Sequence, residues 1–235
     1  MTKAILFDFD GTLVDSAPAI VKTMEQTFFH LGVTVPEERA MRATIGLPLA
    51  TALQQLGSLT DEQAAMATAT YRELFPQFAL SHLTVFPQVL DTLDILRIQG
   101  IRMGIVTSRE SSSLDHIMQH HSMASFFEAS VTGADGFKPK PAPDMAKALL
   151  DRMGLSPEEA IVVGDTTFDI EMGNGCGCRT IAVTYGNHDA QTLATAHPTY
   201  MVDEFVKIME LVCSSCLPPY DRYRNSPYTP QPLQP

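Results

Sequence analysis

The chain has 235 residues, 45% of them hydrophobic, and a formal net charge of −11 at pH 7. This length accommodates one large domain, or a core domain with a smaller companion, around a buried apolar centre. The negative charge argues against nucleic acid or a membrane surface as the partner, because binding to either needs a basic protein face. The net negative charge of the chain is instead compatible with a metal ion or another small cation as the partner.

No apolar run is long enough to cross a bilayer, and the first residues lead into a strand-like segment without the regions of a secretory signal. We therefore expect a cytoplasmic protein. The four cysteines form two close pairs, Cys176 with Cys178 and Cys213 with Cys216. Two such pairs are compatible with zinc, but one lies in a glycine-rich turn and the other near the C-terminus. Reduced thiols are the favoured interpretation.

The first strand-like segment, Ala4–Phe7, runs directly into the acidic motif Asp8–Thr12. Strand side chains alternate in direction, so Asp8 and Asp10 are expected to point the same way. Two like charges at one place cost Coulomb energy unless a cation lies between them, and Gly11 allows the chain to turn sharply away. A divalent metal ion is the simplest cation that would offset this repulsion. The alternative is an ordinary acidic turn after a strand, with no bound ion.

Four further apolar runs predict buried parallel strands, and helical patterns separate them. The expected strands are Arg102–Thr107, Ala129–Thr132, Ala160–Gly164 and Thr180–Thr184, and the expected helices are Val89–Gln99, Ser111–His121, Pro143–Met153 and Thr167–Met172. This alternation predicts an α/β fold with a doubly wound parallel sheet, in which ligands gather at the carboxyl ends of the strands.

The segment between the first two strands shows only helical patterns, at Ala17–Leu31, Pro36–Thr44, Leu49–Leu56 and Thr60–Ala79. We expect residues 16–83 to form a helical subdomain inserted into a core made of residues 1–15 and 84–212. The short borders of the insertion, Val14–Ser16 and Ser81–Phe86, are candidate hinges. Residues 213–235 are rich in proline and are expected to be a disordered tail.

The residues that follow the predicted strands are expected to meet at one edge of the sheet. They are Asp8 and Asp10, Thr107 and Ser108, Lys140, and Asp165 with Asp169. Asp165 can complete a magnesium site with Asp8 and the backbone carbonyl of Asp10, because magnesium prefers oxygen ligands. A hydroxyl of Thr107 or Ser108 can donate to a phosphate, and Lys140 can offset negative charge. The set is typical of phosphate chemistry.

Each residue taken singly also has a plainer interpretation. Ser108 has the character of a helix N-cap, and Asp169 that of a first-turn acid. Lys140 lies in a proline-rich segment that is compatible with a stiff exposed loop. Lys138 competes with Lys140, because both begin a Lys-Pro-x-Pro string. The order of the whole set favours the functional interpretation.

Over about residues 3–212, the chain resembles the haloacid dehalogenase superfamily of phosphatases, in the branch of phosphoglycolate phosphatase and β-phosphoglucomutase. The family's four motifs match Asp8–Thr12, Val106–Ser108, Lys140–Asp144 and Gly164–Asp169. The helical insertion is similar to that branch's mobile cap. The segment Thr44–Pro48 resembles its substrate-specificity loop, which places Gly46 near the substrate.

The resemblance implies a role for each matched residue. Asp8 would be the nucleophile that forms an aspartyl-phosphate, and Asp10 the acid that protonates the leaving oxygen and then activates water. Relatives that cleave carbon–halogen bonds lack an aspartate at this place, so Asp10 favours a phosphatase. The remaining assignments are Lys140 as the catalytic lysine, Mg²⁺ on Asp8, Asp10 and Asp165, substrate binding by Thr107, Ser108, Gly46 and Arg42, and support by Thr12 and Asp169. For Arg42, an exposed helix charge is the open alternative.

The sequence thus predicts a magnesium-dependent phosphatase for a small phosphorylated metabolite, such as phosphoglycolate or a sugar phosphate; inorganic pyrophosphate also fits. A phosphomutase, which passes the phosphoryl group to a sugar hydroxyl, is the alternative with the same fold. A non-catalytic module that senses a phosphorylated metabolite is the alternative from another class. Neither the substrate nor the oligomeric state follows from the sequence.

Overall fold

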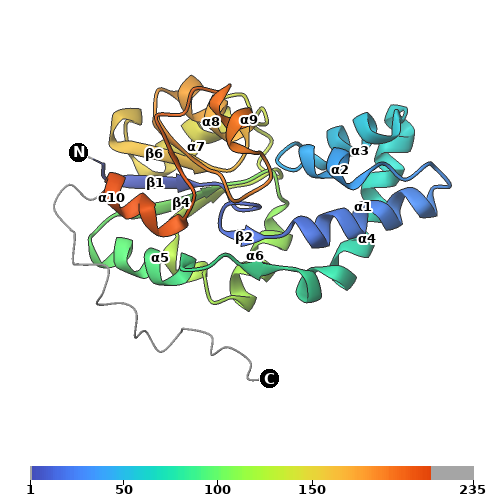
Figure 1. Cartoon of the computed structure of the whole chain (residues 1–235), viewed down its shortest axis with the longest axis horizontal. Coiled ribbons are helices and arrows are strands. Elements are labelled where there is room, and N and C mark those ends of the chain that lie inside the picture. The colour runs from blue at the N-terminus through green and yellow to red at the C-terminus, as the bar shows by residue number, and fades with distance from the viewer. Residues whose placement is uncertain (1, 213–235) are drawn as a thin grey trace.

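The computed structural model of the chain describes residues 2–212. Six parallel strands form one sheet in the order β5-β4-β1-β6-β7-β8 (Figure 1). Their bounds are β1 Ala4–Phe7, β4 Arg102–Val106, β5 Ala129–Val131, β6 Ala160–Gly164, β7 Arg179–Val183 and β8 Tyr200–Val202. The strand β1 lies between β4 and β6, with Phe7 in register with Ile105 and Val163. The predicted doubly wound α/β fold is confirmed.

Both faces of the sheet are covered by helices, as is usual for parallel sheets. In Figure 1, α5, α6 and α10 lie below the sheet and α7, α8 and α9 lie above it. Their bounds are α5 Val89–Ile98, α6 Ser111–His120, α7 Asp144–Met153, α8 Thr167–Cys176, α9 Ala190–Ala194 and α10 Ile208–Val212, with 3-10 turns at Ala124–Phe126, Pro157–Glu159 and Phe205–Lys207. The strand β1 serves both layers, because Ile5 and Phe7 pack on one side and Ala4 and Leu6 on the other.

The segment between the first two strands of the sheet forms a separate lobe, which we call the cap and which lies at the right of Figure 1. It contains α1 Ala17–His30, α2 Glu38–Ala43, α3 Leu49–Gly57 and α4 Asp61–His82. Its two ends meet in a short antiparallel ribbon of β2 Val14–Asp15 and β3 Thr84–Val85. The candidate hinges are therefore paired with each other.

The long helix α4 begins at a reciprocal capping box. The Thr60 hydroxyl accepts from the Gln63 N–H at 3.3 Å, and the Gln63 side chain accepts from the Thr60 N–H at 2.9 Å. The helix continues through Pro76 to His82, beyond the predicted end at Ala79. One face of α4 packs on α1 through buried residues of both helices.

Sequence patterns missed the edge strand β8, because its apolar run of three residues is shorter than the runs from which a strand is predicted. Two of these apolar side chains are exposed, Tyr200 by 37% and Met201 by 43%. Cys176 and Cys178 are buried free thiols, while the second cysteine pair and the predicted tail lie outside the described residues. Within residues 2–212, no helix combines the length and the apolar character needed to span a bilayer.

Candidate active site

A cavity of about 860 Å³ lies between the cap and the carboxyl ends of β1 and β4. The core contributes the segments that follow these strands, and the cap contributes α1, α4 and the loop between α2 and α3. The lining includes Asp8, Asp10, Thr107, Ser108 and Arg109 from the core, and Gly46, Tyr71, Arg72 and Phe75 from the cap. The cavity is thus at the strand ends where the sequence places the ligand.

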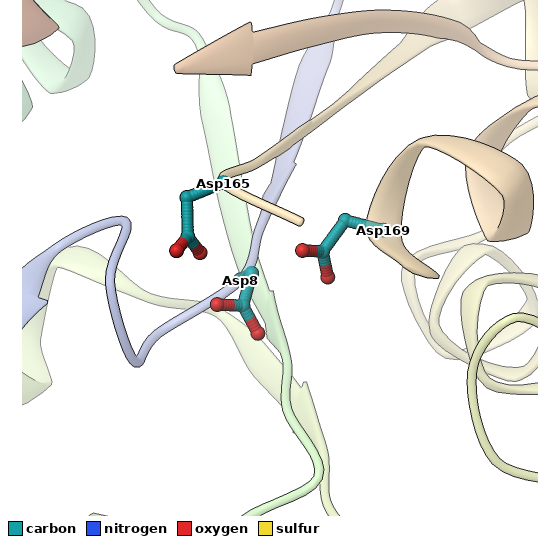
Figure 2. A group of neighbouring side chains, drawn as sticks. All are labelled: Asp8, Asp165 and Asp169. Atoms are coloured by element: carbon teal, nitrogen blue, oxygen red, sulfur yellow. The ribbon is translucent and has the colours of Figure 1, made fainter. Parts of the chain in front are cut away.

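Three buried carboxylates meet beside this cavity. Asp8 follows β1, Asp165 follows β6, and Asp169 lies in the first turn of α8. Figure 2 shows the three side chains converging, and each offers an oxygen within 4.8 Å of the others. The Asp8 N–H donates to the Val163 carbonyl at 2.8 Å, which continues the β1–β6 ladder and fixes where Asp8 stands.

Lys140 provides the positive charge of this cluster. Its Nζ donates to Asp8 Oδ1 at 2.5 Å and to Asp169 Oδ1 at 2.6 Å, and the residue is 2% exposed. Burial opposes the charge, but the two carboxylates outweigh burial and raise the pKa of Lys140, so that it stays protonated. Lys138 is exposed on the same loop. The structure therefore brings Lys140, and not Lys138, to the carboxylates.

Asp169 has a structural and an electrostatic role together. Its Oδ2 accepts from the Thr166 N–H at 3.0 Å and from the Thr166 hydroxyl at 2.6 Å, which caps α8. Its Oδ1 accepts from Lys140. A side chain on Gly164 would come within 2.2 Å of Asp169, so this close packing needs glycine there. Asp169 is therefore the first-turn acid that the sequence suggests, and it also pairs with Lys140.

Asp165 is held by groups on two other segments. Its Oδ1 accepts from the Thr12 hydroxyl at 3.1 Å, and its Oδ2 accepts from the Asn187 N–H at 2.7 Å and the Asn187 side-chain amide at 2.8 Å. Burial, reinforced by the charge of Asp169, raises the pKa of Asp165 to about 7. Burial also raises the pKa of Asp8, against the opposing charge of Lys140. Ionising both groups together therefore calls for a compensating cation.

Gly11 allows the first loop to pass directly against Asp165. Its φ is +90°, and an added Cβ would lie 2.1 Å from Asp165 Oδ2 and 2.3 Å from Asn187 Nδ2. Gly100 makes a matched control, because its φ of +75° is also left-handed but nothing lies within 4 Å.

We expect Gly100→Ala to lower the free energy of unfolding by about 1 kcal/mol through backbone strain alone. Gly11→Ala is expected to cost roughly 2 kcal/mol more, because Asp165 or Asn187 must move. Urea denaturation of the two variants measures the difference. Equal losses of unfolding free energy in the two variants would show that the close approach of Gly11 to Asp165 does not contribute to stability.

Asp10 faces a different partner from the other acids. Its Oδ2 accepts from Arg109 Nε at 2.9 Å and its Oδ1 from Arg109 Nη2 at 2.5 Å, with side-chain exposures of 12% for Asp10 and 8% for Arg109. No sequence pattern indicated Arg109 or Asn187. Arg109 directly follows Ser108, which was predicted to bind substrate, and this neighbourhood is the one sequence feature that could have indicated Arg109.

The remaining predicted residues divide between the site and the surface. Thr107 is 1% exposed at the end of β4, and Ser108 donates its hydroxyl to the Gly46 carbonyl at 2.7 Å, which joins the core to the cap loop. Ser108 does not cap α6, whose N-cap is Glu110. Arg42 pairs with Glu38 at 2.8 Å on the exposed side of α2 and does not line the cavity. Glu38 lies one helical turn from Arg42, and the two side chains form an i,i+4 ion pair.

The comparisons with known proteins agree with this architecture. The family model for haloacid dehalogenase-like hydrolases matches residues 5–183. A Dickeya dadantii (strain 3937) protein named "Probable phosphatase IndB" is 35% identical over 214 residues, which cover 89% of this chain and 93% of that protein. A phosphoglycolate phosphatase of Vibrio cholerae is 32% identical over 224 residues, covering 91% and 98%.

The fold is also shared with solved structures. A haloacid dehalogenase-like family hydrolase from Streptococcus pneumoniae is similar with a TM-score of 0.81 and 28% identity, covering 89% of this chain and 98% of that one. The predicted resemblance is confirmed. The chain belongs to the haloacid dehalogenase-like hydrolase family and is an enzyme of its phosphatase group.

Proposed function

We propose that the protein is a magnesium-dependent phosphatase that hydrolyses a small phosphomonoester through an aspartyl-phosphate on Asp8. One observation carries the proposal: Asp8 lines the cavity, with Lys140 Nζ 2.5 Å from its Oδ1 and Asp10 beside it on the same loop. The names of the two relatives above support a phosphatase, and that of the Vibrio protein makes phosphoglycolate the first substrate to test.

The acidic cluster fits a magnesium ion by charge and by ligand type. When ionised, the three carboxylates and the Lys140 ammonium leave two negative charges, which a divalent cation balances. Oxygen ligands are those that magnesium prefers. Asp169 caps α8 through Thr166 and pairs with Lys140. We assign Asp8 and Asp165 as the side-chain ligands and the Asp10 carbonyl as a third, as the match to the family's motifs implies. Magnesium at this place would neutralise carboxylate charge and polarise a phosphoryl oxygen.

The residues of the chain can divide the reaction into two steps. Asp8 attacks phosphorus and forms an acyl phosphate, while the departing alkoxide oxygen takes a proton from Asp10. Asp10 then takes a proton from water, whose oxygen attacks phosphorus and releases inorganic phosphate and the free Asp8 carboxylate. Thr107 accepts the Arg109 N–H at 3.1 Å, which leaves its own hydroxyl hydrogen to donate to the phosphoryl group. Lys140 offsets the charge that gathers on the transferring group.

A phosphate-release screen tests this function. Purified protein is assayed with phosphoglycolate, sugar phosphates, pyrophosphate and p-nitrophenyl phosphate, first with magnesium and then with a chelator. We expect release from at least one monoester with magnesium, loss on chelation, and recovery when magnesium is restored. Release from no substrate would contradict the proposal, and isomerisation of a sugar phosphate without release would indicate a phosphomutase.

Magnesium is expected to raise the melting temperature more at about pH 8 than at about pH 5. The pKa of Asp165 is raised to about 7, above its unfolded value of about 3.9. A raised acid stabilises the fold below the unfolded pKa, and that contribution is lost as pH rises through the folded pKa. The metal-free protein therefore weakens across this interval.

Bound cation offsets the loss, and free magnesium at ten times its dissociation constant adds about 1.4 kcal/mol. Thermal unfolding at both pH values, with magnesium and with chelator, measures the effect. Asp165→Asn serves as the control, because it removes the titrating ligand. Equal magnesium shifts at the two pH values would contradict the assignment of Asp165.

A further inference from the structure

Arg109 fixes the direction of the Asp10 carboxylate. Two parallel hydrogen bonds, from Nε and from Nη2, engage both carboxylate oxygens at 2.9 and 2.5 Å. A bidentate pair of this kind restrains the rotation of a carboxylate as well as its position. Because both side chains are largely buried, water competes weakly for these bonds.

The cap holds the guanidinium of Arg109 from the other side. Its central carbon lies over the ring of Phe75 on α4, 4.8 Å from the ring centroid. The Phe75 ring in turn stacks on Tyr71, with centroids 5.7 Å apart and planes at 19°. A cation over an aromatic face is attracted to it, and more strongly where water is excluded. Arg109 thus lies between a cap aromatic pair and the acid.

The backbone of Arg109 does not depend on the cap. Its N–H donates to the Thr107 hydroxyl at 3.1 Å, and its carbonyl accepts from the Gly133 N–H at 3.0 Å. Within the core, Nη1 also donates to Ser113 at 2.7 Å. The core therefore places the root of the side chain, whereas Phe75 supplies the contact that a moving cap would add or remove.

Neighbouring residues of the same loop also contact the cap. Ser108 donates to the Gly46 carbonyl, and Glu110 pairs with Arg72 of α4 at 2.5 Å. Three consecutive core residues therefore touch the cap, and the middle one touches Asp10. The Asp10 backbone is also linked to the ribbon that joins cap and core, through its bridge to Val14.

We propose that Arg109 is a positioning residue that makes the placement of Asp10 depend on contact between Phe75 of the cap and the core. The inference rests on the proposed function, in which Asp10 donates a proton to the leaving group. Phe75 restrains Arg109, and Arg109 orients the Asp10 carboxyl group, whose transferable proton is carried on the side of an oxygen that faces away from the guanidinium. Proton donation is then efficient only while the cap covers the cavity and excludes water.

The test uses the dependence of kcat/KM on the leaving group. p-Nitrophenolate departs without a proton, whereas the alkoxides of ethyl phosphate and phosphoglycolate need one. Since kcat/KM covers the steps up to departure of the leaving group, a misplaced acid lowers it selectively for alkyl esters. The variants are Arg109→Lys, which keeps the charge without the fork, and Phe75→Leu, which removes the ring.

Arg97→Lys is the matched control. Arg97 pairs with Asp94 at 2.6 Å and lies 5.5 Å from the Phe126 centroid, so it makes the same kinds of contact away from the cavity. We expect Arg97→Lys to leave all three kcat/KM values unchanged. For Arg109→Lys, the loss with both alkyl esters is expected to exceed the loss with p-nitrophenyl phosphate by about tenfold or more. Phe75→Leu is expected to shift the values in the same direction by less.

Combining Arg109→Lys with Asp10→Asn is expected to add no further alkyl-ester loss, because the two residues act through one group. Equal losses for all esters would overturn the inference, and losses confined to phosphoglycolate would show instead that Arg109 binds the substrate carboxylate. Thermal unfolding of each variant separates these results from misfolding. A wild type inactive on every ester would overturn the proposed function itself.

Discussion

Asp8→Asn is expected to abolish phosphate release, with kcat lowered by roughly 10⁴-fold or more. An amide oxygen is a poor nucleophile toward phosphorus, so no covalent intermediate can form. The shape of the site is expected to persist, because the Asn carbonyl can still accept the Lys140 ammonium hydrogen that Asp8 Oδ1 accepts at 2.5 Å. The proposed magnesium site would also lose one anionic ligand.

The melting temperature of Asp8→Asn distinguishes a loss of chemistry from a folding defect. Burial raises the pKa of Asp8, which means that the metal-free fold disfavours its charge. We therefore expect the metal-free Asp8→Asn protein to melt no lower than the wild type at about pH 8. Asp151→Asn, at an exposed position on α7, is the control and should retain full activity. Turnover above about one hundredth of wild type would rule out Asp8 as the nucleophile.

The sequence predicted the sheet because its strands are buried on both faces. The four residues of β1 are fully buried, and such segments appear as continuous apolar runs between turn signals. Once the strands are parallel, their ends share one edge, which brings Asp8, Asp165 and Asp169 together without further information. The strand β8 does not meet this criterion, because its apolar run has only three residues and only Val202 of them is buried.

Contacts over long separations were beyond pattern analysis. Arg109 is 99 positions from Asp10, and Asn187 is 22 from Asp165, so no periodicity or local motif joins either pair. The sequence was also unable to separate Lys138 from Lys140, because the same proline pattern follows both. Only the path of the folded loop decides which ammonium is buried. For Arg42 the partner is local, because Glu38 lies four residues earlier on α2. The sequence did not show which face of α2 would point toward the cavity.

The aspartates of the site differ in which part of the protein holds their carboxylate oxygens. Asp165 accepts three hydrogen bonds and Asp169 also accepts three, so their oxygens are fixed by the core. Asp10 instead accepts from one guanidinium that also lies on a cap residue. In the proposed function this difference has a use: a fixed Asp165 suits a metal ligand, whereas the Asp10 carboxyl group needs to be oriented only when the cap covers the substrate.

Lys140→Met is expected to lower the free energy of unfolding by about 3–5 kcal/mol at about pH 8, because it leaves Asp8 and Asp169 buried without their counter-charge. Phosphate release should fall by at least about 10²-fold, since the transferring group also loses that charge. The stability loss should shrink at about pH 5, where the raised pKa of Asp8 lets that carboxyl bind a proton. Lys138→Met, on the exposed part of the same loop, is the matched control and should change stability by less than about 0.5 kcal/mol. Urea denaturation and phosphate release measure both variants, and equal effects at the two lysines would contradict the assignment of Lys140 to the acidic cluster.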